Sequence, residues 1–191
     1  DDGFQNTSIH KDISILVIDG EVGFGNGKIF PAGPLRENVE NGIKKANAVL
    51  IVGDDTKRLT ISIKNFQNMA LKILSGHLIP ELNDINLKGE RVLAFAGIGR
   101  PEKFFRTVRS LGCKISETAE FNDHHNYTVD EINNLERRAK NMNAILVTTS
   151  KDRIRLDKAT AINVIEIPVI LKLEDSSELL DLLKPILPDE T

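Results

Sequence analysis

The sequence has few of the residues on which several classes of protein depend. Its single cysteine, Cys113, excludes an internal disulfide framework and fits a reducing compartment. Aromatic residues make up only 5% of the chain and tryptophan is absent, which argues against a surface that stacks nucleic-acid bases. The formal net charge of -3 leaves no basic footprint, so no nucleic-acid partner is expected. No apolar run reaches the length of a membrane-spanning helix.

What the sequence does contain is the pattern of an α/β protein. Its 191 residues, 40% hydrophobic and 28% charged, are enough to form a buried core. Apolar runs of strand length alternate with helical segments, which predicts parallel sheets with right-handed crossovers and helices on both faces. The predicted strands are 13–20, 48–53, 71–79, 91–96, 114–121, 144–149 and 162–170, and the predicted helices are 38–47, a segment near 64–70, 101–111, 128–142 and 175–185. We expect a boundary at Lys88 that separates a domain 1–88 from a C-terminal α/β domain 89–191.

The chain begins with Asp1-Asp2-Gly3-Phe4-Gln5. Paired carboxylates before a glycine are typical of the C-terminal end of a buried strand in nucleotide-binding α/β proteins. One carboxylate there can bind Mg²⁺, and the other can orient a water or a side chain. The residues alone fit a solvated surface pair equally well. Because neither an initiator methionine nor an apolar strand precedes the pair, we expect this chain to be the C-terminal part of a longer enzyme.

Other chemically reactive segments also follow predicted strands. Ligands of open parallel sheets bind beyond the C-terminal ends of the strands, so we expect these segments to share one edge of a sheet. They are Asp1-Asp2, the loop after Asp19, the turn 97–100, Asp123-His124-His125, and 148–152.

The loop 21–37 contains a glycine cluster that resembles a phosphate-binding loop but does not match its pattern. Ile29 follows Lys28 where serine or threonine is required, and Val22 stands at the position of the first glycine. We therefore interpret this part as a flexible surface loop. The segment 31–37 is more constrained, with two prolines and a glycine that present Arg36 and Glu37 at a helix start. Arginine suits bidentate phosphate contact and glutamate suits Mg²⁺, although a capped helix with a surface ion pair explains them equally well.

Two adjacent histidines, His124 and His125, precede a predicted helix that begins with the capping pattern Thr128 to Glu131. A histidine beside an acid can act as a general base, and Asp123 could fix the tautomer of His124. Neighbouring residues in extended backbone point to opposite sides, so we expect only one of the two to face a site. A polar surface loop is the alternative interpretation. The one cysteine and four histidines lack metal-ligand spacing, so we expect no metal site made from them.

Taken together, six segments resemble the tetraacyldisaccharide 4'-kinases, the lipid A 4'-kinases of Gram-negative bacteria. They are Asp-Asp-Gly-Phe-Gln at 1–5, Gly-Phe-Gly-Asn-Gly at 23–27, Pro-Ala-Gly-Pro-Leu-Arg-Glu at 31–37, Leu-Ala-Phe-Ala-Gly-Ile-Gly at 93–99, Phe-Asn-Asp-His-His-Asn-Tyr at 121–127 and Val-Thr-Thr-Ser-Lys-Asp at 147–152. They follow the family's order and span residues 1 to about 156. The combination is specific, although each piece is not.

The resemblance implies a P-loop-type kinase that moves the γ-phosphoryl group of ATP to the 4'-hydroxyl of a lipid A disaccharide precursor. It also implies Mg²⁺ and peripheral attachment to the cytoplasmic face of the inner membrane through an N-terminal part outside these residues. Asp1 and Asp2 match the family's Walker-B-like acids, with Asp2 expected on Mg²⁺ and Asp1 in a catalytic role. Gln5, Arg36 and Glu37 match the nucleotide site, and Glu37 also the metal site.

The family pairs a histidine of its Asp-His-His segment with an aspartate of the N-terminal half, as a dyad acting on the attacking hydroxyl. We expect His124 in this role, with His125 as the second choice. The chain departs from the family's usual residues at Asn6, Arg100 and Ser150, where histidine, asparagine and an acid are common.

Because the 191 residues contain no Walker A pattern, we expect this chain to be inactive alone. A metal phosphoesterase of the Asp-His-His type, which would need Asp19, Asp54 and Asp55 as further ligands, is the first alternative. A non-catalytic remnant of a split gene is the second.

Overall fold

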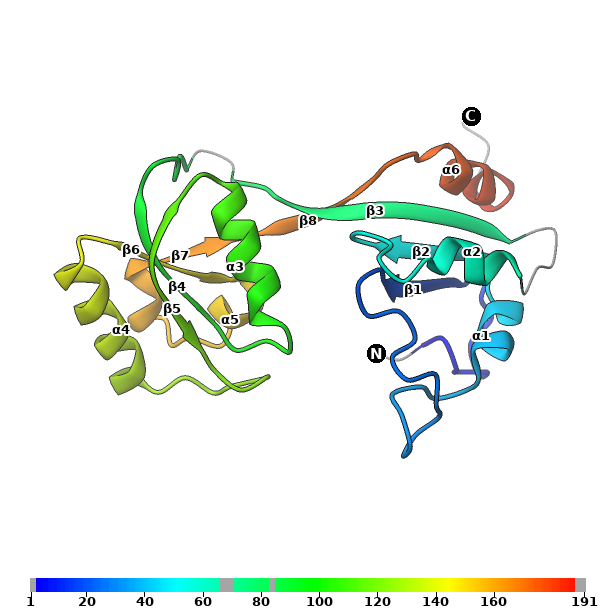
Figure 1. The fold of residues 1–191 in the computed structure, drawn as a ribbon, viewed down its shortest axis with the longest axis horizontal. Helices are drawn as coiled ribbons and strands as arrows, with labels where there is room; N and C mark the ends of the chain where they lie inside the picture. The colour runs from blue at the N-terminus through cyan, green and yellow to red at the C-terminus, as the bar shows by residue number, and fades with distance from the viewer. Residues whose placement is uncertain (1–2, 66–70, 83–84, 188–191) are drawn as a thin grey trace. The chain divides into compact units, whose positions relative to one another are not determined.

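The computed structural model describes residues 3–65, 71–82 and 85–187, which form two compact units, each of the α/β class (Figure 1). Unit 1 comprises Asp1–Leu78 and Leu171–Thr191, and unit 2 comprises Ile79–Ile170. The predicted α/β class is therefore confirmed. The units do not coincide with the division expected at residue 88, because the last part of the chain returns to the first unit. No helix among the described residues is both long and apolar enough to cross a membrane.

Unit 1 is built on a four-stranded sheet. Strands β1, β2 and β3 are parallel to one another, and β8 follows β3 at the end of the order β1-β2-β3-β8. The backbone of Glu174 donates to Ser75 O, and that of Glu81 donates to Pro168 O, so β8 runs antiparallel to β3. The strands are β1 Ile15–Asp19, β2 Ala48–Val52, β3 Lys72–Pro80 and β8 Val169–Leu173, and the helices are α1 Val39–Lys45, α2 Leu59–Lys64, α6 Ser177–Leu183 and the 3-10 turn η2 Lys184–Ile186.

The two faces of this sheet bury different residues because alternate side chains of a strand point to opposite sides. One face packs against α1 and α2, and its buried members are Ile18, Ile43, Val49, Ile51, Leu59 and Ile63. The other face holds a smaller cluster beside α6, with Ala48, Leu50 and Leu74 as its buried members.

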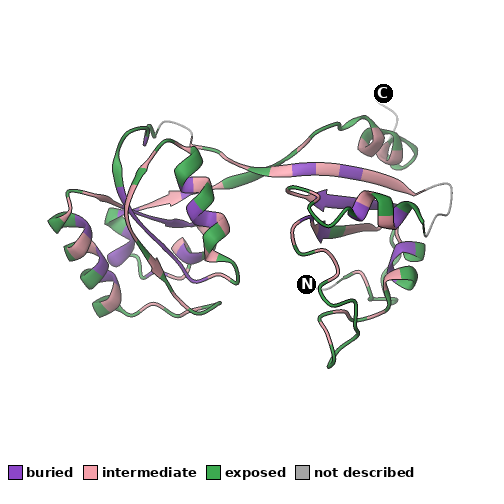
Figure 2. Cartoon of the chain, viewed as in Figure 1, coloured by how far each residue is buried: buried purple, intermediate pink, exposed green. Residues whose placement is uncertain are grey.

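Unit 2 is a fully parallel sheet in the order β5-β4-β6-β7. Its central strand β4 reads Arg-Val-Leu-Ala-Phe-Ala, and the last five side chains are fully buried, as expected for a strand covered on both faces (Figure 2). The strands are β4 Arg91–Ala96, β5 Lys114–Glu120, β6 Ile145–Thr149 and β7 Val164–Ile167, and the helices are α3 Pro101–Ser110, α4 Val129–Asn141, α5 Ser150–Arg153 and the 3-10 turn η1 Thr160–Asn163.

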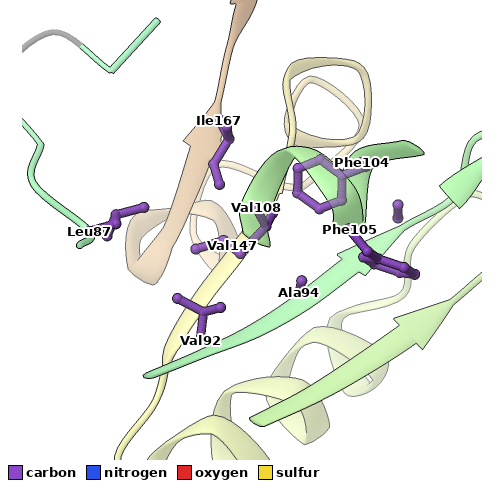
Figure 3. Close-up of a cluster of buried hydrophobic side chains, with 9 residues drawn as sticks. Leu87, Val92, Ala94, Phe104, Phe105, Val108, Val147 and Ile167 are labelled. Carbon is purple, nitrogen blue, oxygen red and sulfur yellow. The ribbon is translucent and has the colours of Figure 1, made fainter. Parts of the chain in front are cut away.

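Two apolar clusters cover the two faces of the unit 2 sheet. Phe104, Phe105 and Val108 of α3 pack on one face, over Ala94 and Val147 of the strands (Figure 3). On the other face, α4 contributes its own buried side chains, and this cluster comprises Leu93, Phe95, Ile132, Leu135, Ala139, Leu146, Leu156, Ala161 and Val164.

Most predicted elements are confirmed within a few residues, and three differ. The strand predicted over 162–170 is divided into η1, β7 and β8, with Pro168 between the two strands, because proline has no N–H to donate to a ladder. The helix predicted near 64–70 is α2, which ends at Lys64, and 66–70 lie outside the described residues. The predicted cap of the last helix is made by Asp175, whose carboxylate accepts from Ser177 N at 2.8 Å, while Ser176 makes no side-chain cap bond.

Candidate functional site

The segments expected at one sheet edge belong to two different sheets. The loop after Asp19 follows β1 in unit 1, whereas the segments 97–100, 121–127 and 149–155 follow β4, β5 and β6 in unit 2. The expectation of a common edge therefore holds for the three segments of unit 2 and is wrong for the set as a whole. Asp1 and Asp2, predicted as catalytic and metal residues, lie outside the described residues.

In unit 1 the structure brings together two of the predicted nucleotide-site residues, Gln5 and Glu37. Gln5 Nε2 donates to Glu37 Oε1 at 3.3 Å, and Lys45 Nζ donates to Glu37 Oε2 at 2.6 Å. The Glu37 side chain is only 18% exposed. The hydrogen bond from Lys45 lowers the pKa of Glu37 and outweighs the opposing effect of its burial, with a further contribution from Gln5. Glu37 is thus an oriented carboxylate at neutral pH.

Glu37 is positioned by the start of α1. Asn38 is the N-cap, and its side chain accepts from Asn41 N at 2.7 Å. This cap fixes the backbone next to Glu37, so the carboxylate turns back toward Lys45 in the last turn of the same helix. Arg36, the neighbouring predicted residue, has an exposed side chain.

The loop that precedes Glu37 has a defined backbone and lies at the surface. Phe30 N donates to Leu35 O at 2.7 Å, and Leu35 N donates back to Lys28 O at 3.2 Å. Gly33 is required here because a Cβ atom would lie 2.1 Å from Asn26 Oδ1. These contacts within the loop hold its backbone in place.

Oxygen donors such as Glu37 fit Mg²⁺ by their chemistry. Residues 3–65, 71–82 and 85–187 contain no group of three or more His, Cys, Asp or Glu side chains that could hold a metal ion. Two of the three aspartates that a two-metal phosphoesterase would need accept backbone hydrogen bonds: Asp19 Oδ1 from Glu21 N at 3.0 Å, and Asp55 Oδ1 from Leu59 N at the start of α2 at 2.6 Å. The described residues therefore give the phosphoesterase interpretation no support.

In unit 2 the two histidines of the Asp-His-His segment have different surroundings. His125 packs on Phe121 with ring centroids 4.8 Å apart, and its Nε2 lies 3.2 Å from both carboxylate oxygens of Glu131. Glu131 also closes the predicted capping box by accepting from Thr128 N at 2.8 Å. The backbone bond from Thr128 and then the His125 ring lower the pKa of Glu131. His125 is therefore tied to the start of α4.

His124, by contrast, has an exposed side chain on a constrained backbone. Its φ of +60° is in the left-handed region, which is uncommon for a residue other than glycine. His124 N donates to Gly97 O at 3.1 Å, which joins the turn after β4 to the loop after β5. This arrangement presents the ring outward at the C-terminal edge of the unit 2 sheet. The choice of His124 as the reactive histidine remains a prediction.

Thr149, Asp152 and Arg155 form a polar network that reaches His124; the first two lie in the predicted strand-end segment 148–152 without an assigned role, and Arg155 lies outside every predicted site segment. Asp152 is completely buried, and Thr149 Oγ1 donates to its Oδ2 at 2.7 Å. Arg155 Nη1 donates to Asp152 Oδ1 at 3.2 Å, and Arg155 Nη2 donates to His124 Nδ1 at 3.0 Å. The Thr-x-x-Asp spacing at 149–152 is a capping pattern that could have identified the first pair from sequence. The Arg155 contact required the fold, because 31 residues separate it from His124.

The chain is similar to proteins of one known family. A family model described as LpxK, Tetraacyldisaccharide-1-P 4'-kinase, matches residues 1–187. The Tetraacyldisaccharide 4'-kinase of Rhodospirillum centenum is 46% identical over 188 residues, which cover 98% of this chain and 55% of the relative. That of Rhodospirillum rubrum is 42% identical over 172 residues, which cover 89% of this chain and 52% of the relative.

A solved structure is also similar. It is the crystal structure of the "apo" form of LpxK from Aquifex aeolicus in complex with ATP, with a TM-score of 0.67 and 26% sequence identity. The match covers 98% of this chain and 56% of that one. The chain thus spans about half the length of the relatives that it matches.

Proposed function

The chain belongs to the tetraacyldisaccharide 4'-kinase family, and we propose that it forms the C-terminal part of an enzyme that transfers the γ-phosphoryl group of ATP to the 4'-hydroxyl of a tetraacyldisaccharide 1-phosphate. The names of the relatives and the ATP complex of the Aquifex aeolicus structure support the substrate class and the nucleotide. The observation in this chain that carries the proposal is the contact of Gln5 with Glu37. It joins the Asp-Asp-Gly-Phe-Gln segment to the Pro-Ala-Gly-Pro-Leu-Arg-Glu segment.

Within this proposal the oriented Glu37 carboxylate, together with Asp2, would hold Mg²⁺, while Gln5 and Arg36 contact the nucleotide. Mg²⁺ supplies neutralisation of the negative charge on the phosphates. Lys45 keeps Glu37 ionised in the absence of the metal, as its lowered pKa indicates. Phosphoryl transfer depends mainly on positioning and charge stabilisation, and these side chains are suited to both.

His124 is proposed to act at the sugar hydroxyl and Asp1 to orient the reacting groups. The 191 residues contain no Walker A pattern, so we propose that the phosphate cradle comes from the N-terminal half found in the relatives. That half would also make the peripheral contact with the cytoplasmic face of the inner membrane. The isolated chain is then inactive.

The test is to fuse the N-terminal half of the Rhodospirillum centenum relative to this chain and to measure ATP-dependent phosphorylation of a tetraacyldisaccharide 1-phosphate. We expect activity from the fusion and none from the 191-residue chain. Asp2→Asn in the fusion should lower turnover by about 100-fold or more, since one electrostatic contact to developing charge is worth about 3 kcal/mol. The control Asp12→Asn removes an exposed carboxylate whose Oδ1 lies 3.3 Å from His10 Nε2, and should keep normal turnover. A folded but inactive fusion would support the remnant interpretation instead.

A further inference from the structure

We propose that Arg155 is a positioning residue that holds the imidazole of His124 with its proton on Nε2, so that His124 presents an N–H donor to its ligand. The inference deepens the proposed function because it assigns the chemical role of the histidine at the acceptor hydroxyl. Only the predicted effects on turnover depend on the proposed kinase function. The arrangement of Arg155 and His124 can be tested on the 191-residue chain alone.

The guanidinium of Arg155 makes three contacts at the edge of the unit 2 sheet. Its Nη2 donates to His124 Nδ1 at 3.0 Å, and its Nη1 donates to Gly97 O at 3.1 Å and to Asp152 Oδ1 at 3.2 Å. Gly97 O also accepts from His124 N. Arg155 therefore contacts the ring of His124 directly and shares an acceptor with its backbone, which fixes both parts of the residue.

Arg155 is itself held in place by a buried carboxylate. Asp152 is fully buried, and its second oxygen accepts from Thr149 Oγ1 at 2.7 Å. The backbone N–H of Arg155 donates to Asp152 O at 2.9 Å. A buried carboxylate needs such partners because an unpaired one is strongly destabilising. With its side chain only 21% exposed, Arg155 has little freedom to adopt another orientation.

The tautomer of His124 follows from the chemistry of arginine. A guanidinium carries donors and no acceptor, so the His124 nitrogen that it contacts must offer its lone pair. A neutral imidazole with a lone pair on Nδ1 carries its proton on Nε2. The neighbouring carboxylate of Asp123 has Oδ1 3.9 Å from His124 Nε2, which is beyond hydrogen-bond distance. Arg155, rather than Asp123 as the sequence suggested, therefore sets the tautomer.

The consequence changes the expected role of the histidine. With Nδ1 engaged, the exposed side of the ring offers the Nε2–H group, and the His124 side chain is 80% exposed. Such a group donates to an oxygen of the substrate or to a carboxylate that acts as the base, and it does not itself remove a proton through Nε2. His124 would thus orient and stabilise, while the proton leaves to another group.

The first experiment measures the ring nitrogens of His124 by long-range ¹⁵N–¹H NMR at neutral pH in the 191-residue chain, with the His124 signal assigned from a His124→Gln spectrum. We expect an unprotonated Nδ1 and a protonated Nε2 in the wild type. Arg155→Met should move both ¹⁵N shifts toward the exchange-averaged values of free histidine. Arg153→Met is the matched control, since Arg153 lines a shallow pocket beside Glu81 and Glu166, and should leave them unchanged. A proton on Nδ1 in the wild type, or identical wild-type and Arg155→Met shifts, overturns the proposal.

The second experiment compares two replacements of His124 in the active fusion. Glutamine places an amide N–H near the position of Nε2 and has no basic lone pair, so His124→Gln should keep kcat within about 10-fold of the wild type. His124→Ala removes the donor and should lower kcat by on the order of 100-fold. Equal losses in the two variants would mean that a basic nitrogen is needed and would overturn the donor role.

Arg155 is tested in the same fusion. Arg155→Met should lower kcat with little change in the KM for ATP, because the nucleotide residues lie elsewhere in the sequence, and Arg155→Lys should restore part of the loss. An Arg155→Met fusion with wild-type kcat, or one whose loss lies only in KM, overturns the positioning role. Should the fusion itself have no kinase activity, the proposed function fails while the NMR experiment still decides the arrangement of Arg155 and His124.

Discussion

The two units hold their candidate residues in different ways. In unit 2, the contacts that fix His124 lead into the interior, through Arg155 to the fully buried Asp152. In unit 1, Glu37 is fixed by Gln5 and Lys45 on the surface of the protein. Among the described residues, the buried polar side chains all belong to unit 2, and they are Thr148, Thr149, Asp152 and Thr160.

The apolar core of unit 2 is also larger than that of unit 1. Among the described residues, the two clusters of unit 2 have nine buried members each, and those of unit 1 have six and three. A larger core supports a polar network because its members are held in fixed positions by close packing. Unit 2 therefore holds its polar side chains through a packed interior, whereas unit 1 depends on surface contacts that solvent weakens.

The largest expected effect tests the core on which the unit 2 loops rest. Phe95 is fully buried and meets Phe121 and Tyr127 edge-to-face, at 6.3 and 5.4 Å between ring centroids. Phe95→Ala should destabilise unit 2 by about 3–5 kcal/mol. Since the chain has one tyrosine and no tryptophan, the urea transition followed by tyrosine fluorescence reports this unit.

The matched control for Phe95→Ala is Ile51→Ala in the core of unit 1, where Ile51 is 1% exposed. It should leave the tyrosine transition in place and lower the hydrogen-exchange protection of β1 and β2. If both substitutions shift both signals by the same amount, the two units unfold as one and the contrast between them does not extend to stability.

A smaller effect is expected where two loops of unit 2 meet at Gly97. A Cβ atom there would lie 2.7 Å from the Tyr127 hydroxyl and 3.1 Å from His125 Cβ. Gly97→Ala should cost about 1–3 kcal/mol, because a close-packed site cannot accept the added atom without movement. The same NMR spectra should show shifted His125 and His124 signals.

The counterpart in unit 1 is Gly27, which has a φ of +71° and nothing within 4 Å of an added Cβ atom. Gly27→Ala should cost only the backbone strain of about 1 kcal/mol and move no neighbouring side chain.

The outcome that would contradict the Gly97 prediction is a Gly97→Ala variant with unchanged histidine signals. It would show that the packing at Gly97 is looser than its distances indicate.

The N-terminal caps of α4 and α1 should respond differently to pH. The effect on the free energy of unfolding is at most about 1 kcal/mol. Glu131, in the capping box of α4, has a pKa lowered below its ordinary value of 4.5. Its contribution to the stability of unit 2 is therefore fully present above pH 4.5 and is lost as the pH falls through the lower folded-state value. Wild type and Glu131→Gln should differ at pH 7 and converge in acid, as measured by tyrosine-detected urea unfolding.

The neutral cap Asn38 of α1 serves as the control for Glu131. Asn38→Ala should lower the stability of unit 1 by a similar amount at both pH values, because an amide does not titrate in this range. A difference between wild type and Glu131→Gln that persists unchanged in acid would mean that the carboxylate charge has no part in the cap.

The sequence predicted the elements of both units more completely than it predicted the contacts between them. Strand β4 and the capping box at Thr128 and Glu131 could be predicted because their sequence signals are local. The strand is an apolar run, and the capping box has a fixed spacing. The contact of Gln5 with Glu37 spans 32 residues, and that of Arg155 with His124 spans 31. Such pairs depend on strand order, which spacing does not encode.

The candidate site shows the same limit, because strand order could not be predicted from the sequence. Among the described residues, the segments after β1, β4, β5 and β6 were correctly predicted as strand ends, but sequence patterns do not assign strands to a sheet. The expectation of one shared edge therefore failed at β1, which pairs with β2 in unit 1, while the segments after β4, β5 and β6 belong to one sheet. The constrained segment 31–37 and the family resemblance both indicated Arg36 and Glu37, whereas the role of Asp152 and the contact of Arg155 came from the structure.

The smallest expected effect concerns Tyr127, whose hydroxyl is buried beside the Asp152 network. Its oxygen has no hydrogen-bond partner in the part of the chain that the structure describes. Burial, then the negative charge of Asp152 and the closeness of the hydroxyl to the same carboxylate, raise the pKa of this phenol well above its ordinary value. The hydroxyl nevertheless does not reach Asp152 with hydrogen-bond geometry. A buried hydroxyl without a partner costs about 1–3 kcal/mol in desolvation that folding does not recover.

Tyr127→Phe should therefore stabilise unit 2 by up to about 1 kcal/mol, because it removes the unpaired hydroxyl and keeps the ring contacts with Phe95 and Phe121. The phenylalanine variant has no tyrosine signal, so its unfolding is followed by circular dichroism beside the wild type. A loss of more than about 1.5 kcal/mol would show that the hydroxyl donates to Asp152 in solution, as hydrogen bonds to charged groups are worth that much. In that case Asp152 would have a third side-chain donor, and the polar network of unit 2 would extend to the ring that covers Gly97.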